Sequence, residues 1–294
     1  MLDSKLYQLF RCSLLAASLA FAGCSAEVSE IPATPTRIIS TAPSVTEILY
    51  AIEADDLLVG VTTYCDYPPE AQTKPIIGDF ASPNIETVLR QEPDLVIILT
   101  GREELEAKFR QFSLPLLILP HESVDAVYGS IYRLGEITQR EAQAMRLVDS
   151  IRGELSQVQD ALSGRTPKRT LFLVGRNPGS LSDIYAVGNA GYLGELIRTA
   201  GGVNVIQDSQ VPYPKISIEQ ILAENPEVII DMSHGEDLTD AEVTSILEMW
   251  DSFPTLTAVQ TRQVHVVESD IFLVPGPRMA EAVRQLARII HRLE

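Results

Sequence analysis

Aromatic and polar side chains recur in the loops that directly follow the predicted strands of this chain. The loops read "TYCDYPP" and "GDFASPN" in the first half and "GRNPG", "VPYPK" and "SDIFLVPGPR" in the second half. Ligands of open α/β sheets bind at the carboxyl ends of strands, where such loops gather. Aromatic faces with few charges suit a large, flat and mostly neutral ligand. The candidate binding residues in these loops are Tyr64, Asp66, Tyr67, Phe80, Arg176, Tyr213, Asp270 and Phe272.

A second interpretation of these loops is purely structural, because prolines and tyrosines also stiffen turns. That interpretation accounts for any one loop, but it accounts less well for the whole set.

Patterns of catalytic and metal-binding sites are missing from the sequence. There is no phosphate-binding glycine loop, no GxSxG turn and no HExxH helix. The four histidines lie far apart, and Cys65 has no second cysteine or histidine nearby, so we expect it to be a small packing residue. The sequence therefore predicts a binding protein rather than an enzyme, with no catalytic residue, no metal site and no cofactor.

One phrase occurs twice in the chain, as "IETVLRQEPDLVI" at 85–97 and as "IEQILAENPEVII" at 218–230. Each copy has a polar cap, about two turns of helix, a proline that ends the helix, and then an apolar strand. Continuous apolar runs are typical of parallel strands that helices cover on both faces. We therefore expect two similar α/β units, with Glu86 and Glu219 at matching positions.

Between the two units, residues 138–164 predict one long helix. Apolar residues recur there at three- and four-residue steps, and Thr138 with Glu141 has the spacing of a capping box. Ser44 and Glu47 have the same spacing ahead of an earlier helix. The predicted fold class is α/β, with two Rossmann-like lobes of mainly parallel sheets, at 37–137 and 165–294, joined by a single long helix.

The N-terminus indicates export. Lys5 and Arg11 precede an apolar stretch at 14–22 that is too short to span a bilayer, as in a signal peptide. The following "FAGC" resembles the lipobox of bacterial lipoproteins. The resemblance implies that residues 1–23 are a signal peptide and that Cys24 is lipidated. Residues 24–36 would then form a flexible tether.

The overall charge excludes some partners. The formal net charge is −17 and the sequence pI is about 4.6. Nucleic acids and anionic membrane surfaces need clustered Lys and Arg, which the sequence lacks.

Four phrases resemble a known family, the substrate-binding proteins of ABC transporters that have two lobes and a helical backbone, also called class III. They are "GVTTYCDYPPEAQ", "PNIETVLRQEPDLVI", "VPYPKISIEQIL" and the stretch "SDIFLVPGPR", and they are most similar to the vitamin B12 branch. The resemblance implies a monomeric, extracytoplasmic component of an ABC importer, on the periplasmic or extracellular side and anchored to the membrane. It would capture cobalamin or a related corrinoid between the lobes and deliver it to the permease dimer with its ATPase.

The resemblance also implies roles for individual residues. Tyr64 matches a tyrosine that contacts the corrin, Phe80 matches a tryptophan, and the stretch from Asp270 through Ile271 matches a loop that contacts the ligand. Phe80 and Ile271 depart from the aromatic residues expected at their positions. The alternative is a haem or ferric-siderophore binding protein of the same class, for which Tyr64, Tyr67 and Tyr213 are possible ligands.

The same resemblance implies a docking role for the two repeated glutamates. In this family one acidic residue on each lobe docks onto arginines of the two membrane subunits, and Glu86 and Glu219 match those positions. The alternative is that a glutamate in the first turn only complements the helix dipole.

Overall fold

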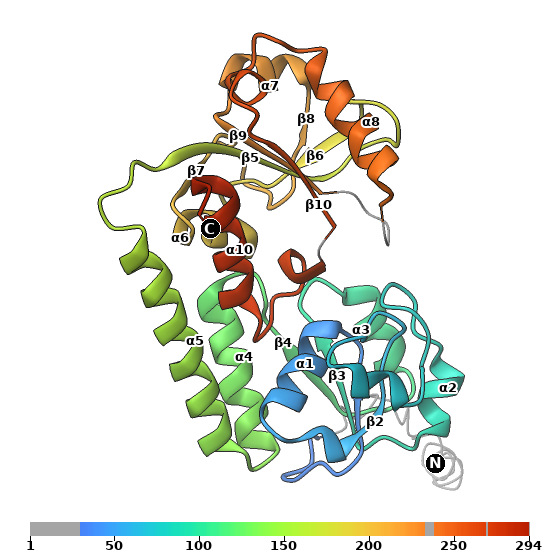
Figure 1. Cartoon of the computed structure of the whole chain (residues 1–294). Coiled ribbons are helices and arrows are strands. Elements are labelled where there is room, and N and C mark those ends of the chain that lie inside the picture. The colour runs from blue at the N-terminus through green and yellow to red at the C-terminus, as the bar shows by residue number, and fades with distance from the viewer. Residues whose placement is uncertain (1–29, 233–237, 269, 294) are drawn as a thin grey trace, which may run out of the picture.

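The computed structural model describes residues 30–232, 238–268 and 270–293, and the predicted signal peptide and Cys24 lie outside these ranges. Two α/β lobes face each other, and a layer of helices runs along one side of both (Figure 1). This arrangement confirms the predicted fold class.

The first lobe is built on a parallel sheet with the strand order β2-β1-β3-β4. The central strand β3 is an apolar run that is buried along its whole length, as expected for a strand covered on both faces. Its strands are β1 (Ile38–Ser40), β2 (Leu58–Gly60), β3 (Leu95–Leu99) and β4 (Leu116–Leu119). Its helices are α1 (Pro43–Ala51), η1 (Asp55–Leu57), η2 (Pro69–Thr73), α2 (Ile85–Arg90) and α3 (Glu103–Arg110).

The second lobe has the strand order β10-β9-β5-β6-β8, with β7 paired to β5. Pairing is parallel among β5, β7, β9 and β10, but β6 is antiparallel to both of its neighbours. The strands are β5 (Lys168–Gly175), β6 (Ile184–Ala186), β7 (Gly202–Asn204), β8 (Lys215–Ile216), β9 (Val228–Met232) and β10 (Val264–Val267). The helices are α6 (Tyr192–Thr199), α7 (Ile218–Glu224), α8 (Asp240–Asp251), α9 (Thr257–Gln260), η3 (Asp270–Phe272) and α10 (Met279–His291).

The repeated phrase forms the same unit in each lobe, helix α2 before β3 and helix α7 before β9. The side chain of Asn84 accepts a hydrogen bond from the amide of Thr87 at 3.0 Å, and that of Ser217 accepts one from Gln220 at 3.3 Å. Both caps therefore place a glutamate at the second helical position.

Helices α4 (Val124–Ile137) and α5 (Glu141–Ala161) form the layer beside the lobes (Figure 1). The buried residues of α5 lie at three- and four-residue steps and belong to a core cluster that includes Leu49 of the first lobe and Phe172 of the second. Helix α10 packs against both α5 and α6. The two lobes thus share one continuous core along this side.

Both capping boxes expected in the first 150 residues are wrong. Helix α5 begins after Arg140, and the hydroxyl of Thr138 instead donates to the carbonyl of Leu134 at 2.7 Å, at the end of α4. Helix α1 begins at Pro43 without a side-chain cap, and Glu47 is buried and paired with Arg278. Thr138 thus bonds to the helix before it, and Glu47 pairs with a residue 231 positions along the chain.

The contact between α4 and α5 yields a prediction from two glycines of α4. A Cβ added at Gly135 would lie 2.5 Å from the Cβ of Ala144, whereas one added at Gly129 would meet nothing within 4 Å. We expect Gly135→Ala to lower the free energy of unfolding by about 1–3 kcal/mol through overpacking. The control Gly129→Ala should raise it by roughly 0.5–1 kcal/mol, because alanine favours helix. Urea unfolding measures both, and equal shifts would contradict this packing.

Candidate functional site

The tyrosine loop of the first lobe, residues 62–68 after β2, presents two of the predicted binding residues to solvent. Tyr64 is 63% exposed and Tyr67 is 45% exposed, and Asp66 between them is exposed as well. Cys65 is buried and anchors the loop, because the hydroxyl of Thr46 in α1 donates to its sulfur at 3.2 Å. Burial raises the pKa of the Cys65 thiol. Cys65 thus attaches the loop to α1, while Tyr64 and Tyr67 face the solvent.

Phe80 lies in a second loop that is tied to the tyrosine loop. The amide of Thr63 donates to the carbonyl of Gly78 at 3.0 Å. The guanidinium of Arg102 lies 4.4 Å from the ring centre of Phe80 and donates to the Phe80 carbonyl at 2.7 Å. Phe80 is therefore half-buried, with Arg102 stacked on its ring.

A depression of about 480 Å³ lies in the second lobe at the carboxyl end of β5. Tyr213 and Tyr185 are 43% and 44% exposed and contribute aromatic surface to it. Partial burial raises the pKa of the Tyr213 phenol, so this group is neutral at physiological pH. Its lining residues are Val174, Gly175, Arg176, Asn177, Asp183, Tyr185, Tyr213 and Leu273.

Arg176 lines this depression, but its charge is already compensated. Its Nε donates to Asp231 at 3.1 Å, and the two side chains are only 7% and 1% exposed. The indole Nε1 of the buried Trp250 donates to the same carboxylate at 2.9 Å. This network connects the end of β5 with β9 and α8. Arg176 therefore contributes to the shape of the depression, but its charge is already paired with Asp231.

Two further candidates are core residues in this structure. Ile271 and Phe272 are 2% and 0% exposed, and the ring of Phe272 packs edge-on against Phe172 at 5.5 Å between centroids. Of Asp270 only the backbone is described, in η3. The side chains of Ile271 and Phe272 therefore belong to the core and present no surface to a ligand.

The segment 271–278, here called the strap, connects the two groups of tyrosines. Leu273 near its start lines the depression of the second lobe. Arg278 at its end places its guanidinium 4.2 Å from the ring centre of Tyr67 in the first lobe. Figure 1 shows the strap running from η3 towards α1 before α10 turns back. The strap thus lines the depression of the second lobe at one end and contacts Tyr67 of the first lobe at the other.

Sequence reasoning missed three residues of this region, Tyr185, Leu273 and Arg278. Tyr185 has a local signal, since it lies between buried Ile184 and Ala186 in β6 and must point to the other face of the strand. Leu273 and Arg278 lie in the stretch "SDIFLVPGPR", but their contacts are with residues distant in the chain, which the stretch itself does not predict.

The two repeated glutamates lie elsewhere, one on each lobe. The side chain of Glu86 is 83% exposed and lies 3.5 Å from Arg90 in the next turn of α2. Glu219 is also exposed, and a hydrogen bond from Ser217 lowers the pKa of its carboxyl group. Both positions present a carboxylate to solvent at a helix N-terminus.

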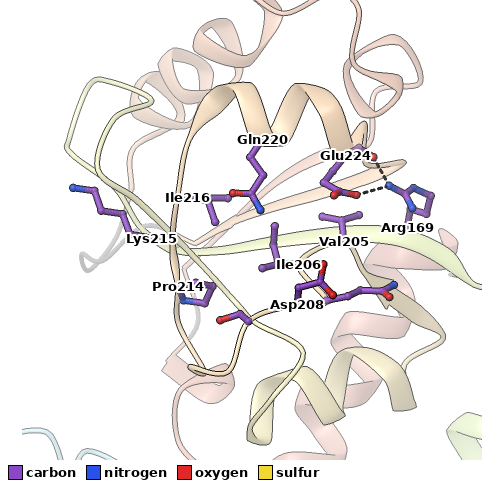
Figure 2. Close-up of a pocket in the computed structure, with 11 residues that line it drawn as sticks. Arg169, Val205, Ile206, Asp208, Pro214, Lys215, Ile216, Gln220 and Glu224 are labelled. Atoms are coloured by element: carbon purple, nitrogen blue, oxygen red, sulfur yellow. Dashed lines mark hydrogen bonds and ion pairs between the residues drawn. The ribbon is translucent and has the colours of Figure 1, made fainter.

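A second depression, of about 460 Å³, lies beneath α7, the helix that carries Glu219 (Figure 2). Gln220 and Glu224 of α7 point into it, and Glu224 pairs with Arg169 at 3.0 Å (Figure 2). Its walls are mostly polar, unlike those of the depression at β5. It therefore suits a flat apolar ligand less well.

Within the described ranges, no three His, Cys, Asp or Glu side chains gather in a way that could hold a metal ion. In the same ranges, no helix has both the length and the apolarity needed to cross a membrane.

Curated relatives resemble this chain over most of its length. A vitamin B12-binding protein of Vibrio cholerae serotype O1 is 31% identical over 258 residues, which cover 87% of this chain and 89% of the relative. A vitamin B12-binding protein of Photorhabdus laumondii is 27% identical over 87% of this chain and 88% of its own length.

Solved structures agree with the fold. The periplasmic vitamin B12 binding protein of Vibrio cholerae superposes with a TM-score of 0.74 at 29% identity, over 88% of this chain and 97% of the other. A periplasmic heme-binding protein from Roseiflexus superposes with a TM-score of 0.70 at 26% identity, over 87% and 98% of the two chains. The family described as periplasmic binding protein matches residues 38–271. With two lobes, a shared helical side and this match over most of its length, the chain belongs to the periplasmic binding protein family.

Proposed function

We propose that this protein captures cobalamin or a related corrinoid between its lobes and delivers it to an ABC importer. The observation that carries the proposal is the set of exposed tyrosines on either side of the strap, Tyr64 and Tyr67 from one lobe and Tyr185 and Tyr213 from the other. Relatives that share this fold over most of their length are named vitamin B12-binding proteins, which supports the choice of ligand.

The chemistry of the region supports a large ligand that carries little charge. Arg176 is bonded to Asp231 and Arg102 is stacked on Phe80, so these cations are already engaged by the protein. Tyrosine rings offer wide apolar faces and a hydroxyl at the rim, which suits a macrocycle edged with amide groups. The proposed contact residues are Tyr64, Asp66, Tyr67, Phe80 and Tyr213, with Tyr185 and Leu273 added from the structure.

A haem-binding function is the second candidate. Two observations favour it: the exposure of Tyr64 and Tyr67, and the heme-binding neighbour from Roseiflexus. Tyr213 favours it less, because a phenol with a raised pKa gives up its proton less readily to become an iron ligand.

The remaining parts of the proposal concern delivery. Cleavage after residue 23 would leave Cys24 as a lipidated N-terminus on the extracytoplasmic side of a membrane, and residues 24–36 would tether a monomer to it. Glu86 and Glu219 would each bond to arginines of one permease subunit, because carboxylate and guanidinium groups form strong, directional pairs. The exposed pair of Glu86 with Arg90 is weak enough to be exchanged for such a partner. Binding and delivery involve no catalysis by this chain.

Ligand binding yields a prediction for single tyrosines. Calorimetry with cyanocobalamin should show binding to the unmodified protein, and Tyr64→Ala or Tyr213→Ala should weaken it by about tenfold, as for an aromatic residue at the centre of a contact. Tyr132→Ala is the control, because Tyr132 is similarly exposed but lies on α4. Absence of heat with cyanocobalamin, together with a Soret band on adding hemin, would indicate that the ligand is haem and not a corrinoid.

Docking yields a second prediction. The double variant Glu86→Arg with Glu219→Arg should abolish uptake in cells that carry the cognate permease and ATPase, while cobalamin affinity stays unchanged. A charge-matched control is Glu104→Arg with Asp240→Arg, which reverses exposed first-turn carboxylates of α3 and α8. Equal uptake by both double variants would show that Glu86 and Glu219 only stabilise their helices.

A further inference from the structure

Glu47 is a carboxylate in an unusual place. It lies on α1, where Val45, Ile48 and Leu49 are also buried, and its side chain is only 1% exposed. A buried carboxylate is costly unless it is paired and hydrogen-bonded. Its partner lies 231 positions along the chain, at the end of the strap.

That partner, Arg278, engages Glu47 with two nitrogens. Its Nε donates to Oε2 at 3.0 Å and its second terminal nitrogen donates to Oε1. This two-point geometry fixes the plane of the guanidinium group. The strap passes close to α1, since a Cβ at Gly276 would lie 3.4 Å from Glu47 Oε2 and 3.6 Å from the Cα of Ser44.

The face of the same guanidinium is occupied by Tyr67. Its central carbon lies 4.2 Å from the ring centre, within the range of a cation–π contact. Glu47 fixes the plane of the guanidinium group. That plane in turn determines where the ring of Tyr67 can stack on it. Tyr67 is still 45% exposed, so part of its surface remains available to a ligand.

The charge of Glu47 also acts on a buried residue of the second lobe. Burial, and after it the charge of Glu47, raise the pKa of the Tyr192 phenol, which belongs to α6. Tyr192 also interacts electrostatically with Tyr213 and Arg278. Glu47 and Arg278 therefore lie where α1 and the strap meet, beside Tyr67.

We infer that Arg278 is a positioning residue for ligand binding: anchored by Glu47, it holds the ring of Tyr67 in the orientation that the ligand meets. A ring that is fixed beforehand loses less conformational freedom on binding, which raises affinity. The inference rests on the proposed function for its effect on affinity, but the ordering of the tyrosine loop is a property of the protein alone.

The first measurement is therefore made without ligand. Arg278→Lys keeps the positive charge but loses the two-point hydrogen bond to Glu47. In this variant the rate of amide hydrogen exchange in the tyrosine loop should rise at least tenfold, while the amides of β3 stay protected. The amides of Thr63 and Cys65 are suitable reporters, because they donate to the carbonyls of Gly78 and Thr62. Arg284→Lys is the matched control, because Arg284 lies in α10, soon after Arg278 in the chain, and pairs with Glu154 of α5. Exchange that is equal in the two variants would overturn the inference.

The second measurement is a double-mutant cycle on cyanocobalamin affinity. Arg278→Lys should weaken binding about tenfold in the unmodified protein and hardly at all when Tyr67 is already alanine. Additive effects would show that Arg278 acts only on the general structure. Glu47→Gln provides a second route to the same loss of anchoring if Arg278→Lys folds poorly. If the unmodified protein does not bind cyanocobalamin but the loop loosens in Arg278→Lys, the corrinoid proposal fails while the positioning role stands.

Discussion

The packing of α5 against its neighbours is the constraint on which the rest of this structure depends. Its buried face joins residues of both lobes into one core cluster, and α10 packs against the same helix. Each lobe has a sheet of mainly parallel strands whose carboxyl ends carry loops, but only a shared core determines how the two sets of loops face each other. The tyrosines of the two lobes can contribute to one site because this side of the molecule is continuous.

The buried pair of Glu47 and Arg278 adds a second connection on the side of the site. A buried ion pair is weak evidence for net stability, since desolvation offsets much of the attraction, but separating its partners is strongly unfavourable. The pair therefore serves to fix geometry. It binds the strap to α1 and places one face of a guanidinium group against Tyr67.

Sequence patterns predicted those parts of the structure that depend on local periodicity. The repeated helix–strand units follow from apolar spacing and caps, and the buried strands and the long helix follow from apolar spacing alone. The exposure of Tyr64, Tyr67 and Tyr213 agrees with their loop positions. What could not be predicted depends on partners distant in the chain. Glu47 has the spacing of a cap but pairs with Arg278, and Phe272 has loop-like neighbours but packs in the core against Phe172.

In the proposed function, the exposed tyrosines on both sides of the strap form one ligand site. The most direct test is a crystal structure of the protein grown with cyanocobalamin. Density for the corrin ring between the tyrosine loop and Tyr213, in contact with both lobes, is the predicted result. A corrin bound to one lobe alone, or in the polar depression beneath α7, would contradict the account.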